Sequence, residues 1–325
     1  KGREGSQAVR SSDYGIAKFS FIKRLLLVHG RYSYLRIVML IQYSFYKNIT
    51  FTLPQFFFSY MTGFSGQTVF DSWVMTFFNM VFTALPIMAF AIFDKDLDEE
   101  FLLKFPELYS RSRRNIDFNF KTFFLWIVNA VAHSLICFFG TWALWTDGVL
   151  DDTGHIFGLW SFGMIITTAI VVLVTLKIAS VVDNWTIFAH ITIWGSLIVY
   201  FLFLLPYSAI AFLTPKDFLG LFFTLGAVPN FWFIWIVLTT VCLLGDISVH
   251  WIYNYVWPSN RQIFRELKLM SYKNGFKKND KTKLLNGDVY KSLIHSLEET
   301  EFPGDTISSR SYGSYSGSHS SLAAT

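Results

Sequence analysis

Long apolar stretches alternate with short polar ones along this chain, and six of the apolar stretches are long enough to cross a membrane. A hydrocarbon core about 30 Å thick requires about 20 apolar residues per helix. Five stretches reach that length without Asp, Glu, Lys or Arg: Ser72–Phe93, Thr122–Thr146, Ile156–Leu176, Asn184–Pro215 and Phe218–Gly245. A sixth, Ile37–Phe70, carries one charge, at Lys47. The pattern predicts an all-α membrane protein with six transmembrane helices.

The composition supports this class, since 53% of the residues are hydrophobic and only 15% are charged. Such a chain is too apolar for a soluble domain whose surface faces water. The formal net charge of +4 reflects where the basic residues lie, and we expect no nucleic-acid partner.

The distribution of Lys and Arg predicts the orientation, because cytoplasmic loops collect these residues. Residues 1–38 hold eight of them and residues 94–121 hold six, whereas loops 63–71 and 147–155 hold none. Both termini are therefore predicted to be cytoplasmic. The expected domains are a lead-in segment at 1–36, a membrane domain at 37–257, and a partly disordered cytoplasmic tail at 258–325.

Lys47 is the first candidate functional residue. An ammonium group near the bilayer midplane costs roughly 2.5–3.5 kcal/mol, so it is retained where it faces protein, water or a polar ligand. On a helix, Tyr43, Lys47, Thr50 and Pro54 share one face, with Asn48 alongside. Pro54 leaves the carbonyl of Thr50 without its helical partner. The pattern predicts a polar pocket at a weak point of the helix.

The next span repeats this design with Thr76, Asn79, Thr83 and Pro86, where Pro86 frees the carbonyl of Phe82. The first five spans contain no Asp or Glu, and Asp246 is predicted at the cytoplasmic end of the sixth. Hard cations need such oxygen ligands at membrane depth. We therefore predict no metal site, and an anionic or zwitterionic ligand for Lys47.

Two plainer interpretations stay open. The polar stripes are also typical of interhelical hydrogen bonds, with Lys47 paired to a carboxylate elsewhere. His133 with Asn129, and His190, are candidate proton relays, but packing histidines with satisfied hydrogen bonds are the favoured interpretation.

Several segments follow one another in an order that is typical of one known family. They are Gly2-Arg3-Glu4-Gly5-Ser6 through Tyr14, Lys23-Arg24-Leu25 through Arg31, Phe45-Tyr46-Lys47-Asn48, Gly63-Phe64-Ser65-Gly66-Gln67, Asn79-Met80-Val81-Phe82-Thr83-Ala84-Leu85-Pro86 and Phe105-Pro106-Glu107-Leu108-Tyr109. In this order they resemble the phospholipid-flipping (type IV) P-type ATPases. The first segment is similar to the end of that family's phosphorylation domain, and the second to the link into its fifth membrane helix. The resemblance implies that the six spans are helices five to ten of a ten-helix transporter.

The resemblance also implies roles. It implies that Lys47 and Asn48 handle the lipid headgroup, with Asn79 of the next helix as a neighbour. Tyr46, Thr50 and Thr83 are further predicted substrate-binding residues, and Pro54 and Pro86 are predicted helix kinks. The resemblance further implies ATP and Mg²⁺ for the full-length protein, a two-span glycosylated accessory subunit, and a Golgi, endosomal or plasma membrane location. The ATP-binding domain and the phosphorylated Asp lie outside the matching residues, so we expect no catalytic residue in this chain.

The resulting hypothesis is the C-terminal membrane half of an ATP-driven flippase that moves phospholipid from the outer or lumenal leaflet to the cytoplasmic leaflet. The alternative is a stand-alone six-span secondary transporter or channel without ATPase activity. A third possibility is a non-enzymatic membrane regulator.

Overall fold

The computed structural model of the chain describes residues 3–145, 158–210 and 218–256, and every regular element in these ranges is a helix. The predicted tail and the ends of three predicted spans lie outside the described residues. Five helical stretches are long and apolar enough to cross a membrane: Ser72–Phe93, Phe120–Trp145, Leu159–Val181, Ile187–Ala209 and Pro229–Tyr253. They match five of the six predicted spans and confirm an all-α membrane fold.

Helix α3 (Arg31–Met61) occupies the remaining predicted span, Ile37–Phe70. Its 31 residues extend about 46 Å at 1.5 Å per residue, which exceeds the thickness of a hydrocarbon core. Its polar side chains, Lys47 among them, lower its mean hydropathy below that of the other five, so the sixth span stays a prediction. The helix ends before the predicted boundary because Gly63 and Phe64 take positive φ angles of 62° and 61°.

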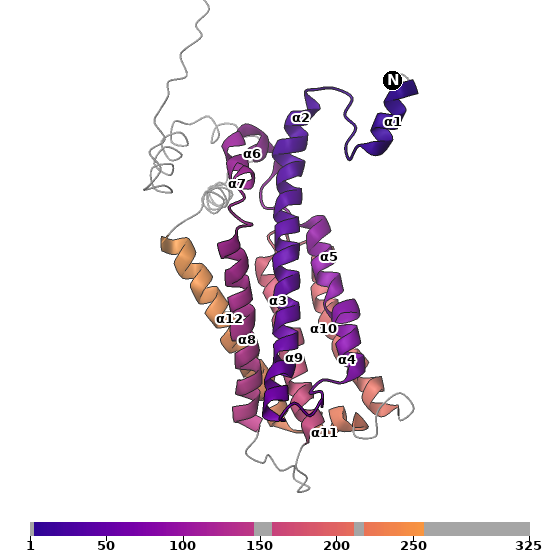
Figure 1. The fold of residues 1–325 in the computed structure, drawn as a ribbon, viewed down its shortest axis with the longest axis vertical. Coiled ribbons are helices and arrows are strands. Elements are labelled where there is room, and N and C mark those ends of the chain that lie inside the picture. Colours follow the sequence, from indigo (N-terminus) through magenta and orange to yellow (C-terminus); the bar gives the residue numbers. More distant parts are fainter. Residues whose placement is uncertain (1–2, 146–157, 211–217, 257–325) are drawn as a thin grey trace, which may run out of the picture. The chain divides into compact units, whose positions relative to one another are not determined.

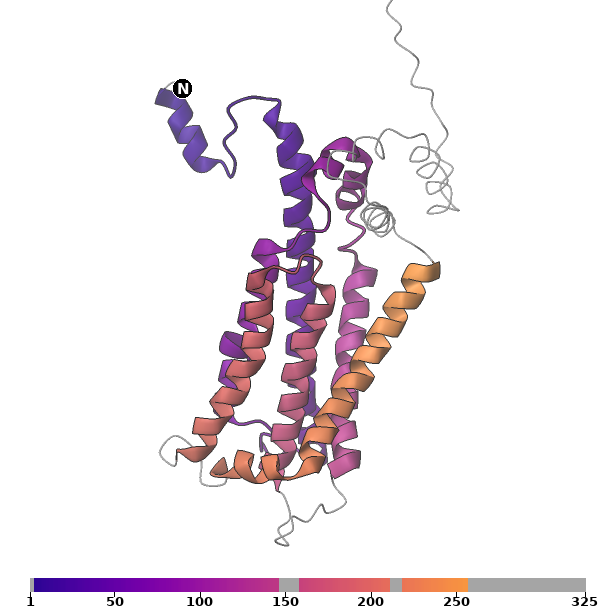
Figure 2. The ribbon, with the colours of Figure 1, turned by 180° about the vertical axis from the view of Figure 1, so that it is seen from behind.

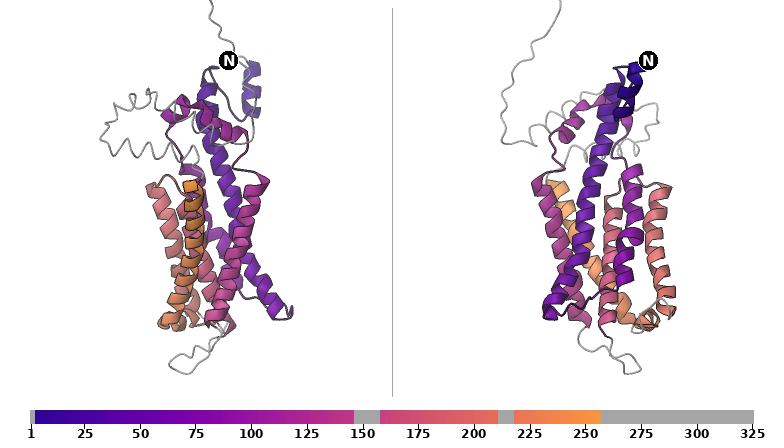
Figure 3. Two further views of the ribbon diagram at one scale, coloured as in Figure 1. Left: turned by 90° about the vertical axis from the view of Figure 1, so that its left-hand side faces the viewer. Right: turned by 45° about the vertical axis from the view of Figure 1, so that its right-hand side comes forward.

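The N-terminal end of α3 continues beyond the other long helices (Figures 1 and 3). After α1 (Arg3–Ser11), helix α2 (Phe21–Arg24) and a π-helical turn (Leu25–Gly30) lead directly into α3. Arg31, only 1% exposed, donates from Nε and Nη2 to Asp96 Oδ2 at 3.0 and 2.7 Å and from Nη1 to the Leu108 carbonyl. These contacts fix the end of α3 to the segment after α5 (Ala84–Phe93).

That segment carries three short helices, α6 (Glu99–Lys104), a 3₁₀ turn (Pro106–Leu108) and α7 (Tyr109–Arg113). The Tyr32 hydroxyl donates to the Leu97 carbonyl. Burial, together with the negative charge of Asp96, raises the pKa of the Tyr32 phenol to about 12. Tyr32 therefore stays protonated, and able to donate, throughout the physiological pH range.

Helix α9 (Leu159–Val181) is the centre of the bundle, and all of its residues from 163 to 175 are buried. It packs against α3, α8 (Phe120–Trp145), α10 (Ile187–Ala209) and α12 (Pro229–Val256). Figure 2 shows α12 running obliquely beside α9. At Gly163 the α9 backbone approaches Val69 so closely that an added Cβ would lie 2.0 Å from the Val69 carbonyl oxygen.

The predicted span Phe218–Gly245 is wrong at both ends. A short helix α11 (Leu221–Ala227) comes first, and Pro229 starts α12, where its missing amide hydrogen costs nothing. Helix α12 then runs to Val256, which places Asp246 inside it. Likewise α9 runs past the predicted end at Leu176 and includes Lys177, which is 7% exposed. The predictions stopped each span at its first charge, but Lys177 and Asp246 pair with each other, so the helices continue.

Candidate functional site

The span Ser72–Phe93 is broken in its middle. Asp71 caps α4 (Ser72–Phe77) by accepting from the amides of Trp73 and Val74 at 2.9 and 3.4 Å. A π-helical turn (Phe78–Phe82) follows, in which the Thr83 amide donates to the Phe78 carbonyl at 3.2 Å. Turns of this kind inside helices are frequent at functional sites.

The break is stabilised from a second helix. Pro86 lies within the first turn of α5 and offers no amide hydrogen to the Phe82 carbonyl four residues earlier. The hydroxyl of Ser196, on α10, donates to that carbonyl instead. The freed carbonyl expected from the sequence therefore has a protein partner.

Lys47 faces this break. Its side chain is 7% exposed, and Nζ donates to Thr83 Oγ1 at 2.8 Å. The Thr83 hydroxyl in turn donates to the Phe78 carbonyl at 2.7 Å. Within the described ranges no carboxylate lies within 4.0 Å of Lys47 Nζ. The Lys47 ammonium carries three hydrogens, and its one hydrogen-bond partner among the described residues is the Thr83 hydroxyl.

The other residues of the predicted stripes have different surroundings. Tyr43, Thr50 and Pro54 are buried like Lys47, but Tyr43 donates to the Val174 carbonyl on α9 at 3.1 Å and Thr50 to the Ala130 carbonyl on α8 at 3.4 Å. The shared face of α3 is therefore divided among several neighbouring helices. Helix α3 continues through Pro54.

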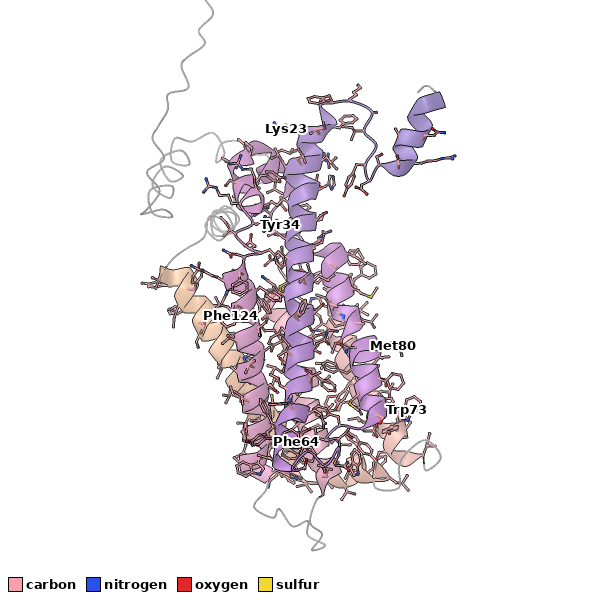
Figure 4. The ribbon with its side chains drawn as sticks, viewed as in Figure 1. Lys23, Tyr34, Phe64, Trp73, Met80 and Phe124 are labelled. Atoms are coloured by element: carbon pink, nitrogen blue, oxygen red, sulfur yellow. The ribbon has the colours of Figure 1, made fainter. Side chains whose placement is uncertain are left out.

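Asn48 and Asn79 are both exposed on the described part of the chain. Met80, beside Asn79, points away from the bundle, as does Trp73, about two turns before Met80 (Figure 4). Among the described residues, neither amide is hydrogen-bonded to Lys47, whose partner is Thr83.

Tyr46, the neighbour of Lys47, belongs to a separate cluster. Its hydroxyl and His133 Nδ1 share a hydrogen bond of 2.7 Å. Asp246 on α12 accepts from Asn129 Nδ2 at 2.7 Å and from Lys177 Nζ, and its Oδ1 lies 3.7 Å from His133 Nε2. We call Tyr46, Asn129, His133, Lys177 and Asp246 the Asp246 network.

Aromatic rings complete this network. Lys177 Nζ lies 5.4 Å from the ring centroid of Tyr46 and 5.2 Å from that of Trp126, within the range of cation–π attraction. The network contains one fixed positive and one fixed negative charge, each with hydrogen-bonding partners. Its arrangement suits a structural role, and His133 fits the packing interpretation.

The sequence prediction missed the Lys177–Asp246 pair. One signal was present: Asn129 and His133 lie four residues apart on one face of α8. Paired polar side chains on a membrane helix call for a polar partner on another helix.

A small cavity lies elsewhere in the described part of the bundle. It is lined by Val69, Asp71, Val74, Trp160, Gly163, Met164, Thr167, Tyr200, Leu204 and Phe218. None of the predicted site residues lines this cavity. What the structure shows at Lys47 is a contact between α3 and the break at residues 78–83.

The chain belongs to the phospholipid-translocating P-type ATPases, because residues 9–259 match the family described as "Phospholipid-translocating P-type ATPase C-terminal". It is 35% identical to phospholipid-transporting ATPase ID of Homo sapiens over 276 residues, which cover 84% of this chain and 23% of that protein. It is 36% identical to phospholipid-transporting ATPase IH of Mus musculus over 260 residues, covering 79% and 22%.

A third relative, phospholipid-transporting ATPase 11C of Mus musculus, is 42% identical over 203 residues, which cover 62% of this chain and 18% of that protein. The chain thus spans about a fifth of the length of these relatives. The family resemblance drawn from the ordered motifs is confirmed.

Proposed function

We propose that this chain is the C-terminal membrane part of an ATP-driven flippase that moves phospholipid from the outer or lumenal leaflet to the cytoplasmic leaflet. One observation carries the proposal beyond family membership. Lys47 is a buried cation that has a hydroxyl, and no carboxylate, as its described partner. Family membership favours the pump over a stand-alone transporter or channel.

The chemistry of the Lys47 site supports a phosphate-bearing ligand. A phosphate oxygen can accept the hydrogens that Thr83 leaves unused, and hydrogen bonds between ionised groups are about twice as strong as neutral ones. A charged headgroup cannot enter hydrocarbon cheaply. A buried ammonium beside the Thr83 hydroxyl lowers the cost of that passage.

The remaining site residues differ in how directly they would contact the lipid headgroup in this proposal. Asn48 and Asn79 are exposed, so a headgroup outside the described helices can reach their amides. Thr83 holds Lys47 when lipid is absent. Thr50 and Tyr46 do not contact the headgroup but hold α3 in place, since the hydroxyl of each bonds to a residue of α8.

The proposal also covers the full-length protein. That protein uses ATP and Mg²⁺, and its catalytic residues lie outside this chain. It assembles with a two-span glycosylated accessory subunit and resides in a Golgi, endosomal or plasma membrane. Both termini of this chain, including the lead-in segment 1–36 and the tail 258–325, are cytoplasmic, in keeping with the basic loops.

The test is Lys47→Ala and Lys47→Glu in the full-length protein, with labelled-lipid uptake and lipid-stimulated ATPase activity as readouts. We expect the lipid concentration for half-maximal stimulation to rise at least about tenfold, equivalent to 1.4 kcal/mol of lost binding, and more for Lys47→Glu. The control is Lys121→Ala, an exposed lysine at the start of α8. Unchanged uptake and stimulation in both Lys47 variants would remove Lys47 from the mechanism.

A further inference from the structure

Building on the proposed function, we infer that Asp246 on α12 is a positioning residue for the Lys47 site. Acting through Lys177, His133 and Tyr46, it sets the rotation of α3 that aims Lys47 at Thr83.

The geometry couples the two sites because Tyr46 and Lys47 are consecutive residues of one helix. Successive side chains on an α-helix point about 100° apart. Lys47 reaches toward the π-helical turn at Phe78–Phe82, and Tyr46 contacts residues of α8 and α9. A rotation of α3 that displaces one side chain must displace the other.

Tyr46 is the better anchored of the two. It is fully buried, its hydroxyl is bonded to His133, and its ring meets Trp126 edge to face at 5.9 Å and 82°. Lys177 Nζ lies over the same ring. Residues from α8 and α9 thereby hold Tyr46 on several sides.

Asp246 holds in place the side chains that contact Tyr46. Its carboxylate accepts hydrogens from Asn129 and Lys177 and lies beside His133. Without that charge, Lys177 would be a buried cation lacking its counter-ion, and its long stem would let the ammonium move toward water. The Tyr46 ring would then lose the cation above it, and α3 would lose the contact that fixes its rotation.

The direct readout is the distance between Lys47 and Thr83. In the full-length protein, the Lys47→Cys/Thr83→Cys variant is treated with a short bifunctional thiol reagent, with and without Asp246→Asn. We expect Asp246→Asn to lower the cross-linking yield at least about fivefold. An unchanged yield overturns the inference.

A reference pair separates local rotation from general unfolding. Thr168 Oγ1 and the Tyr200 hydroxyl lie 2.8 Å apart between α9 and α10, away from the Asp246 network. The Thr168→Cys/Tyr200→Cys pair should cross-link equally well with and without Asp246→Asn. The native Cys137 and Cys242 are buried and present in every variant, so they contribute the same background.

If Asp246→Asn lowers both yields, the double variant Lys177→Met/Asp246→Leu decides, because it removes both charges and leaves no buried ion unpaired. The inference requires a low Lys47–Thr83 yield with a normal reference yield in this variant. A normal yield for both pairs overturns it. Lys177→Arg, which keeps a cation over the rings, should cross-link like the wild type at both pairs.

Activity gives a second readout with native Lys47 and Thr83. We expect Asp246→Asn to raise the lipid concentration for half-maximal ATPase stimulation about fivefold and to change the maximal rate less than twofold. A merely structural role would lower the amount of active protein and leave that concentration unchanged. If Lys47→Ala does not affect lipid stimulation, the proposed function fails, while the cross-linking yields still decide the positioning role of Asp246.

Discussion

The two sides of α3 hold their buried polar groups in opposite ways. On one side Tyr46 joins a network in which Lys177 and Asp246 neutralise each other and each has further partners. On the other side Lys47 has a single described hydroxyl as partner, at a break in the facing helix. A balanced charge stabilises helix packing, whereas an unbalanced one is retained at a cost and indicates ligand binding.

The largest difference between the two sides should appear in stability. Asp246→Ala leaves Lys177 buried without its counter-ion, and breaking a buried pair in this way costs about 3–5 kcal/mol. We expect a lower unfolding temperature in detergent and a lower free energy of unfolding in equilibrium denaturation.

Lys47→Met is the matched comparison on the other side of α3. It replaces a cation without a described counter-ion by an apolar chain of similar length, so we expect stability to rise by about 1–3 kcal/mol. Equal destabilisation by Asp246→Ala and Lys47→Met would mean that both sides of α3 are built for packing alone.

The break facing Lys47 provides the next test. Ser196→Ala leaves the buried Phe82 carbonyl without its partner, at an expected cost of about 1–3 kcal/mol. The matched control is Ser134→Ala on α8, because Ser134 is equally buried and its hydroxyl has no hydrogen-bond partner among the described residues. Thermal unfolding of the two variants should differ; identical values would show that Ser196 does not stabilise the break.

The smallest effect concerns Tyr32, which lies at the N-terminal end of α3, before the predicted span. The folded-state pKa of Tyr32, about 12, exceeds the ordinary value near 10. Its protonated phenol therefore contributes stability that is fully present below pH 10 and lost as the pH rises through about 12. As the pH rises, we expect the free energy of unfolding to fall further in the wild type than in Tyr32→Phe. The difference should be less than about 1 kcal/mol after allowance for solvent screening.

The measurement is the free energy of unfolding of wild type and Tyr32→Phe at pH 9 to about 12. Subtracting the two curves cancels the other tyrosines. Parallel curves would contradict a contribution from the Tyr32 proton.

The sequence predicted much of the fold, because five spans are apolar enough to be recognised by length and composition alone. Two of the predicted site residues, Lys47 and Thr83, lie in contact in the structure, while their role in lipid binding stays a prediction. These successes depend on local properties: run length, helical period and the missing amide of proline.

Its failures depend on pairing between distant residues. The predicted spans stop before Lys177 and Asp246 because each charge was judged alone, whereas the two side chains pair with each other across 69 residues and both helices continue past them. The sequence also did not show which neighbouring helix the Tyr46 side chain contacts. Helical period says which side chains share a face, but not which neighbouring helix each one meets.

At Gly163, α9 and the segment leading into α4 touch backbone to backbone, and the smallest added side-chain atom would fall 2.0 Å from the Val69 oxygen. An alanine there would force the two main chains apart, because the atom it meets belongs to the backbone and not to a side chain that can turn away. Asp71, which caps α4, follows Val69 by two residues. The absence of a side chain at Gly163 therefore lets the start of the broken span lie directly against α9.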